Sequence, residues 1–119
     1  TNTVLIAGGI SLATTESVDP ATISFTRRGN LTRVRAYHTA DRLSSRVVLM
    51  AGGSSNAGAD IYDPILGVVT ATLPMNVPRS RHTSSVIEIG GSKKVLITGG
   101  QTPLTDTGEV YDSVTGSFI

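Results

Sequence analysis

The amino-acid sequence predicts an all-β protein built from repeated four-stranded units. The composition is the first observation: 39% of the 119 residues are hydrophobic, 13 are glycine and 5 are proline, and no stretch carries apolar residues at helical spacing over several turns. Short runs rich in Val, Ile, Thr and Leu, bounded by Gly, Asn, Asp and Pro, are typical of strands joined by turns. The second observation is a recurrence, because three apolar runs each end on a glycine pair: Gly8-Gly9, Gly52-Gly53 and Gly99-Gly100. The pairs begin 44 residues apart (8 to 52) and then 47 apart (52 to 99), a period found in repeat architectures such as β-propellers.

The three copies agree at further positions. An acidic residue follows each glycine pair, and an aspartate follows that acid three residues later: Glu16 and Asp19, Asp60 and Asp63, Glu109 and Asp112. Alignment on these aspartates, without a gap, places Arg35 over Arg79 and His38 over His82. Both histidines of the chain therefore occupy one repeat position, which indicates that a single supersecondary unit has been duplicated.

This set of residues resembles the kelch repeat, a β-propeller family. The resemblance covers nearly the whole chain, and its best stretches are VVLMAGG, ADIYDP, RSRHTSSV, VLITGG and GEVYDSVTGSF. The copies depart from the family pattern at Val18, where the others have a tyrosine, at Val69, where an aromatic residue is expected, and in the absence of tryptophan. The resemblance implies kelch-type propeller blades.

Each copy is expected to supply up to four strands. The expected strands lie near 3–8, 15–19 and 23–27, then 36–43, 46–52, 59–63 and 67–72, and finally 82–89, 94–99, 108–112 and 116–119. The run Val47–Met50 is continuously apolar, as expected of a strand covered on both faces. Aromatic side chains should fill the space between blades, at positions 25, 62, 111 and 118.

The chain is too short to close a ring, because propellers usually have about 4–8 blades. We expect about 2.75 four-stranded blades, and hence an incomplete propeller. Residues 1–34 form a partial blade that lacks its first strand, 35–80 a second blade and 81–119 a third, all parts of one larger propeller domain. A fragment or an incompletely observed chain is favoured over two copies that close a six-bladed ring, although open blade faces permit self-association.

Charge and composition exclude several function classes. The net charge is +1, and the small basic clusters lack the concentrated basic face that nucleic-acid binding requires. No apolar run is long enough for a membrane span. The chain has no cysteine, so the cysteine–tyrosine cross-link of galactose oxidase, a copper enzyme on a kelch-type propeller, cannot be assembled from this segment. No cofactor is expected, and the compartment is undetermined, with an extracellular or cell-surface location favoured over the cytoplasm.

The repeated residues are interpreted as structural before functional. His38 and His82 could bind a metal, but repeat-equivalent residues usually repeat a hydrogen bond, and we expect Arg35 and Arg79 to bond the acids or strand carbonyls of each blade. The acid pairs recur in every blade, which argues against catalysis. Residues 53–58 have the glycine spacing of a phosphate-binding loop but lack the following Lys and Ser or Thr, so a turn is expected. Arg81 is a candidate ligand contact, and Asn30 begins an N-glycosylation acceptor sequence.

The resemblance implies a non-catalytic protein-interaction scaffold that recognises its partner through loops between strands. The candidate contact loops, at 10–15, 54–59 and 101–108, differ between copies while the flanking frame does not. The partner would be another protein or the remaining blades of the same propeller. Two alternatives stay open: part of a carbohydrate-binding or carbohydrate-active propeller, galactose-oxidase-like or related to sialic-acid recognition, and a structural propeller protein that assembles.

Overall fold

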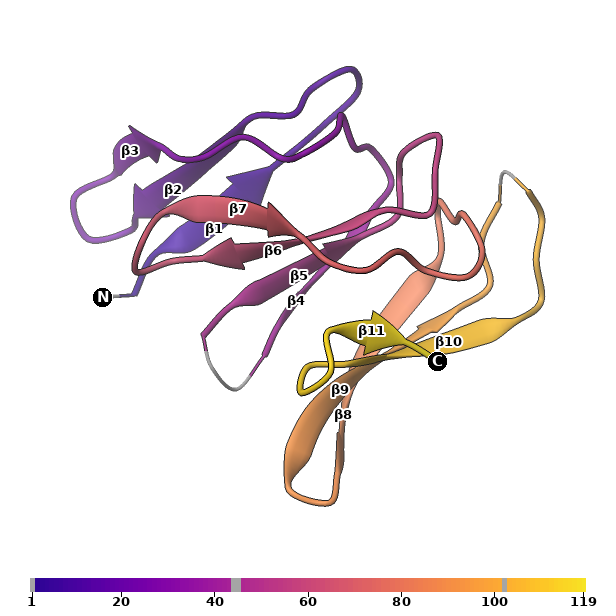
Figure 1. The fold of residues 1–119 in the computed structure, drawn as a ribbon. Helices are drawn as coiled ribbons and strands as arrows, with labels where there is room; N and C mark the ends of the chain where they lie inside the picture. The colour runs from indigo at the N-terminus through magenta and orange to yellow at the C-terminus, as the bar shows by residue number, and fades with distance from the viewer. Residues whose placement is uncertain (1, 44–45, 102) are drawn as a thin grey trace.

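The chain folds into three antiparallel sheets (Figure 1). A computed structural model describes residues 2–43, 46–101 and 103–119. The first sheet contains β1 (Val4–Ala7), β2 (Thr15–Asp19) and β3 (Ser24–Arg27); the second contains β4 (Thr39–Arg42), β5 (Val48–Ala51), β6 (Ala59–Asp63) and β7 (Val68–Ala71); and the third contains β8 (Thr83–Ile89), β9 (Ser92–Thr98), β10 (Gly108–Asp112) and β11 (Ser117–Phe118). Strands that follow one another along the chain pair within each sheet. Within the described ranges there is no helix that could cross a membrane.

The all-β fold class predicted from the sequence is confirmed, and every expected strand is present. Three strand boundaries differ from the prediction by two residues or more, and one of them is the start of β5, at Val48 rather than near residue 46. The first strand of the second sheet begins at Thr39 rather than near residue 36, because Tyr37 adopts a left-handed φ of 58° that interrupts an extended chain. Strand β9 begins at Ser92 rather than near residue 94, because Gly90 and Gly91 both have positive φ and form a tight two-residue hairpin turn.

The apolar core lies between neighbouring sheets. The larger cluster joins the second and third sheets and contains Leu43, Leu49, Ala51, Ala59, Met75, Val95, Ile97, Tyr111 and Phe118. The smaller cluster is formed by Leu31, Met50 and Tyr62, with Leu5 and Ala7 of the first sheet packed against it. Leu49 and Met50 are both fully buried, one in each cluster. Strand β5 is therefore covered on both faces, which accounts for its continuous apolar run.

Three of the four aromatic positions fill the space between sheets as predicted. Tyr62, Tyr111 and Phe118 are buried, and the last two rings pack with their centroids 5.0 Å apart. The prediction is wrong for Phe25, whose side chain is 59% exposed. Phe25 pairs with Val18 and so lies on the face of the first sheet opposite the buried Ser17, where no other sheet of the chain packs.

An aspartate organises the turn between the last two strands of every sheet. The carboxylate Oδ1 of Asp19, Asp63 and Asp112 accepts a hydrogen bond from the backbone amide two residues further on, at 2.8–2.9 Å. The Lys94 ammonium also donates to the Asp112 carboxylate at 2.6 Å, and this hydrogen bond lowers the pKa of Asp112. The repeated aspartate thus sets the turn in each copy.

The same turns require a left-handed residue four positions after the aspartate. Gly67 and Gly116 occupy this position with φ of 69° and 70°. In the first copy the position holds Ile23, with φ of 54°. A β-branched residue in this region is strained, so the first turn carries a backbone cost that the other two avoid.

Candidate functional site

One end of the three sheets carries the loops that follow the glycine pairs, and these loops differ between copies. We call it the loop end: it comprises the glycine-pair loops 10–15, 54–59 and 101–108 and the connections 28–38 and 72–82 that lead from one sheet to the next. Thr102 lies outside the described residues. The connections and glycine pairs meet directly, since the Ala36 amide donates to the Gly53 carbonyl at 2.9 Å. The loop end is therefore a continuous surface that spans the sheets.

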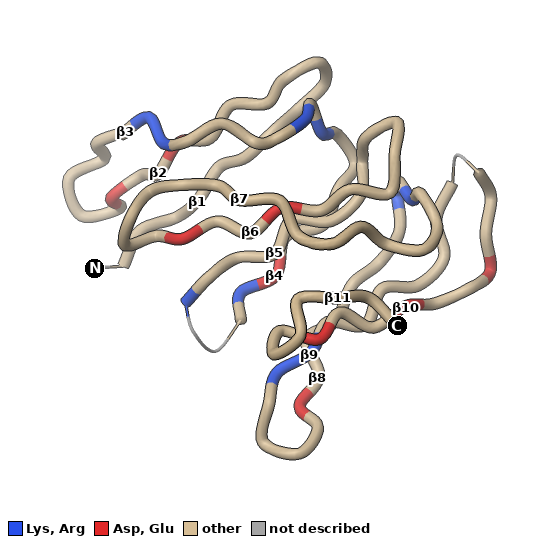
Figure 2. Tube along the Cα trace, viewed as in Figure 1, with Lys and Arg blue, Asp and Glu red and all other residues tan. Residues whose placement is uncertain are grey.

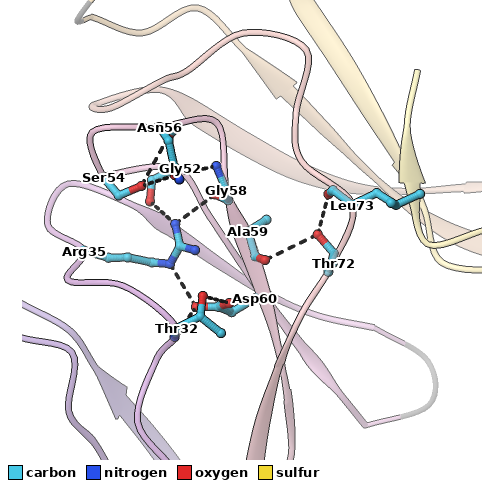
Figure 3. Close-up of polar contacts among 10 residues, drawn as sticks. All are labelled: Thr32, Arg35, Gly52, Ser54, Asn56, Gly58, Ala59, Asp60, Thr72 and Leu73. Atoms are coloured by element: carbon cyan, nitrogen blue, oxygen red, sulfur yellow. Dashed lines mark hydrogen bonds and ion pairs between the residues drawn. The ribbon is translucent and has the colours of Figure 1, made fainter.

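A buried arginine holds the loop end of the second sheet (Figure 3). The Arg35 Nε donates to the Asp60 carboxylate at 3.1 Å, and its Nη1 donates to the carbonyls of Gly52 and Gly58 at 2.9 and 2.8 Å. Both Arg35 and Asp60 are fully buried or nearly so, and Asp60 also accepts hydrogen bonds from the backbone and hydroxyl of Thr32. One guanidinium thus joins the incoming connection, the glycine pair and strand β6.

Arg79 repeats this arrangement in the third sheet. Its Nε donates to Glu109 at 3.2 Å, and its Nη1 donates to the carbonyls of Gly99 and Thr107 at 2.8 and 2.7 Å. Glu109 in turn accepts from the backbone amides of the connection that precedes Arg79. We call Arg35 with Asp60, and Arg79 with Glu109, the two arginine clamps. Removal of one partner of such a buried pair typically costs about 3–5 kcal/mol.

The clamps also join one sheet to the next through the backbone. The Arg35 carbonyl accepts a hydrogen bond from the Gly9 amide at 2.8 Å, and the Arg79 carbonyl accepts one from the Gly53 amide at 2.7 Å. A Cβ on Gly52 would lie 2.4 Å from the Arg79 carbonyl oxygen. A glycine is needed there because the next connection crosses at backbone contact distance.

The two histidines lie beside the glycine pairs. The Nε2 of His82 is hydrogen-bonded to the Thr39 hydroxyl at 3.0 Å. The Cε1 of His82 lies against Gly52, and the Cε1 of His38 lies against Gly8 in the same way. Burial, and then the nearby clamp arginine, lower the pKa of both imidazoles, which favours the neutral form. Within the described ranges no three His, Cys, Asp or Glu side chains are placed to hold a metal ion.

The residues that precede the two histidines form an exposed pair at the loop end. The Arg81 guanidinium carbon lies 4.3 Å from the centroid of the Tyr37 ring, and the Arg81 amide donates to the Tyr37 carbonyl at 2.9 Å. Both residues have left-handed backbones, with φ of 58° and 52°. The Tyr37 side chain is 52% exposed, so the pair presents an aromatic surface and a cation to solvent from a fixed backbone.

Sequence reasoning selected Arg81 but missed Tyr37. The signal was available, because Tyr37 stands immediately before His38 just as Arg81 stands immediately before His82. Tyr37 and Arg81 share a left-handed backbone at one repeat position, so the two connections adopt the same local conformation there. The contact between the two side chains depends on how the second and third sheets pack.

The other sequence-selected residues lie apart from this pair. The Asn56 side chain accepts from the Gly58 amide and from Ser54 at 2.9 Å, so residues 53–58 form a closed turn. Asn30 is exposed on the connection from the first sheet. Glu16 is half-buried on the first sheet, and no clamp to it is formed by an arginine within the described ranges.

Comparison with known proteins identifies the fold. No protein-family model and no curated protein matches the chain. Among solved structures, the chain is similar to a fungal alcohol oxidase of the AA5 family in complex with copper, with a TM-score of 0.76 and 17% sequence identity. The match covers 100% of this chain and 28% of that one, so the chain spans less than a third of the length of the oxidase. This likeness shows a β-propeller-like fold.

The donor set of the chain does not fit the copper of that neighbour. The sequence has no cysteine and two histidines, and these histidines stand at repeat-equivalent positions with no third nitrogen, sulfur or carboxylate ligand beside them in the part of the chain that the structure describes.

Proposed function

We propose that this chain is a segment of a kelch-like β-propeller that binds carbohydrate at its loop end, without catalysis by the residues present here. The observation that carries the proposal is the exposed Tyr37–Arg81 pair on a backbone fixed by the two arginine clamps. The structural likeness to an oxidase of the AA5 family supports this over a purely protein-binding scaffold.

The pair offers the two kinds of contact that a sugar uses. An exposed tyrosine ring can pack against the apolar C–H face of a pyranose, and the guanidinium edge offers several N–H donors to hydroxyl or carboxylate oxygens. Arg81 already stacks on the ring and is held by its own amide. Both side chains are thus partly ordered before a ligand arrives, which reduces the entropy cost of binding.

Calorimetric titration with a small panel tests the proposal. Lactose and sialyllactose carry galactose without and with a sialic acid, and cellobiose lacks galactose. We expect Tyr37→Ala and Arg81→Ala each to weaken binding by about tenfold, the loss of roughly one good contact. The matched control is Phe25→Ala, which removes an equally exposed aromatic ring from the outer strand of the first sheet. Equal affinities for wild type and all three variants, or no binding of any of the three oligosaccharides, would refute the proposal.

A protein-interaction scaffold is the second candidate, because the same end exposes large apolar side chains. Ile10 is 73% exposed, Leu12 49% and Leu104 87%. Exposed apolar residues on loops of a rigid frame are typical of protein contacts. A double variant Ile10→Ser/Leu104→Ser separates the two candidates. Its affinity for the sugar should stay within about twofold of the wild-type value, whereas a protein partner that binds these loops should bind the variant much more weakly.

A further inference from the structure

Two adjoining cavities lie between the first and second sheets, at the end opposite the loop end. Each has a volume of about 280 Å³. The first is lined by Asn2, Thr3, Leu5, Ser17, Arg42, Arg46, Val48, Tyr62 and Pro64, and the second by Thr3, Arg28, Arg46, Pro64 and Ile65. They share Thr3, Arg46 and Pro64, so they form one continuous groove with an apolar floor from Leu5 and Val48.

The charge of this groove is one-sided. Three arginines line it and no acidic side chain does. Within the described ranges, neither Arg42 nor Arg46 takes part in an ion pair, and neither does Arg28, whose Nε donates instead to the Ser17 hydroxyl at 2.8 Å. Figure 2 shows the basic residues on both arms of the β4–β5 hairpin, beside the first sheet.

The acids nearest in sequence point elsewhere. Asp41 precedes Arg42 on β4 and therefore faces the opposite side of the sheet, where its charge acts on His82. The Asp63 Oδ1 is occupied by the backbone amides of Ile65 and Leu66 in its turn. Among the described residues, the side chains that line the groove therefore include three cations and no carboxylate.

Arg46 lines the groove from the turn between β4 and β5. Its φ is 73°, a left-handed value that a residue other than glycine rarely adopts, and its amide donates to the Leu43 carbonyl at 3.1 Å.

We propose that this groove binds a small anionic molecule, of about the size of one sugar ring, through a carboxylate or phosphate group. Each of the two adjoining cavities, at about 280 Å³, is slightly smaller than the roughly 300–1,000 Å³ typical of small-ligand sites. Arg42 and Arg46 contact the anionic group by charge-assisted hydrogen bonds, Arg28 and Ser17 border the neighbouring cavity, and Leu5 and Val48 pack against the ring. The site is separate from the loop end and does not depend on the function proposed above.

The test is calorimetric titration of the 119-residue chain with four probes: glucuronate, glucose 6-phosphate, inorganic phosphate and glucose. At about 0.01 M ionic strength, where the Debye length is roughly 30 Å, charged contacts are least screened. We expect glucuronate or glucose 6-phosphate to bind at least about tenfold more tightly than glucose, and more tightly than inorganic phosphate. Whichever of the two binds better identifies the anionic group.

Matched variants locate the site. Arg42→Gln/Arg46→Gln should weaken the tighter of the two interactions by at least about tenfold. The control Arg27→Gln/Arg33→Gln removes the same charge from two exposed arginines that do not line the groove. Its affinity for the same probe should stay within about twofold of the wild-type value. Three results would overturn the proposal: equal weakening by both double variants, binding of glucose as tight as that of the better sugar anion, or binding of inorganic phosphate as tight as that of the better sugar anion. Circular dichroism verifies folding, and amide shifts of Leu5 and Ser17 on titration give a second readout that needs no substitution.

Discussion

Gly53→Ala is the substitution for which the structure makes the sharpest prediction. Gly53 has a φ of 71°, and a Cβ at this position would lie 2.3 Å from the Ala36 carbonyl oxygen and 2.8 Å from the backbone nitrogen of His38. Gly116 provides a matched control: its φ is 70°, but a Cβ there would meet no atom within 4 Å. The two substitutions therefore impose the same backbone strain, and only the first also forces the 28–38 connection away from the glycine pair.

The expected magnitudes follow from this difference. A left-handed alanine costs roughly 1–2 kcal/mol, and the reduced entropy of the unfolded chain returns about 0.4–1 kcal/mol. Gly116→Ala should therefore lower the free energy of unfolding by about 1 kcal/mol. Gly53→Ala must in addition displace neighbouring backbone to which Gly53 is hydrogen-bonded. The Gly53 amide donates to the Arg79 carbonyl at 2.7 Å, and the Gly53 carbonyl accepts from the Ala36 amide at 2.9 Å. The two weakened hydrogen bonds cost about 1 kcal/mol each, and overpacking costs about 1 kcal/mol more. Added to the backbone strain of about 1 kcal/mol, these terms lower the free energy of unfolding of Gly53→Ala by roughly 4 kcal/mol.

Urea unfolding followed by far-ultraviolet circular dichroism measures both values. The slope of the transition should be unchanged for Gly116→Ala, so that its midpoint reports stability directly. If the two variants lost the same free energy to within about 0.5 kcal/mol, the close approach of the connection to the glycine pair would not be a feature of the folded chain.

Three further predictions use the same unfolding measurement. Ile23→Gly should raise the free energy of unfolding by about 0.5–1 kcal/mol, because it removes a left-handed β-branched residue at an exposed turn; a loss would contradict the strain. Arg79→Met should lower it by about 3–5 kcal/mol, because Glu109 stays buried without its partner, whereas the exposed Arg33→Met should change it by less than about 0.5 kcal/mol. Stability should also fall as the pH drops below 6.5, because the pKa of His82 is lowered in the folded state and the unfolded chain takes up a proton that the folded chain does not. This loss levels off once the pH is below the folded pKa, and His82→Gln should reduce the slope; an identical slope in the variant would contradict the shift.

The repeat explains what could be predicted from the sequence. Strand positions follow from apolar runs and turn residues, which act locally, and the alignment of three copies places Arg35 over Arg79 and the acids over one another. Each arginine clamp could be anticipated because a buried charge requires a partner. The repeated acids, Asp60 and Glu109, are the carboxylates that recur in the same copies as Arg35 and Arg79.

Features that depend on packing between sheets could not be predicted in this way. Phe25 occupies the same repeat position as the buried Phe118 but lies on a face that no sheet of the chain covers. Tyr37 and Arg81, which are in contact, are 44 positions apart (37 to 81), and the groove brings Ser17 of the first sheet near Arg46, which is 29 positions away (17 to 46) beside the second sheet. No spacing within one copy encodes these contacts.

The central claim is that the clamped frame presents the loop end as a binding surface. Nuclear magnetic resonance tests it directly, by titration of the isotope-labelled chain with whichever oligosaccharide of the panel binds most tightly. The account predicts amide shifts at Tyr37, Arg81 and the glycine-pair loops, and unchanged signals at the aspartate turns at the opposite end. Shifts confined to those turns, or an unchanged spectrum at saturating sugar, would contradict it.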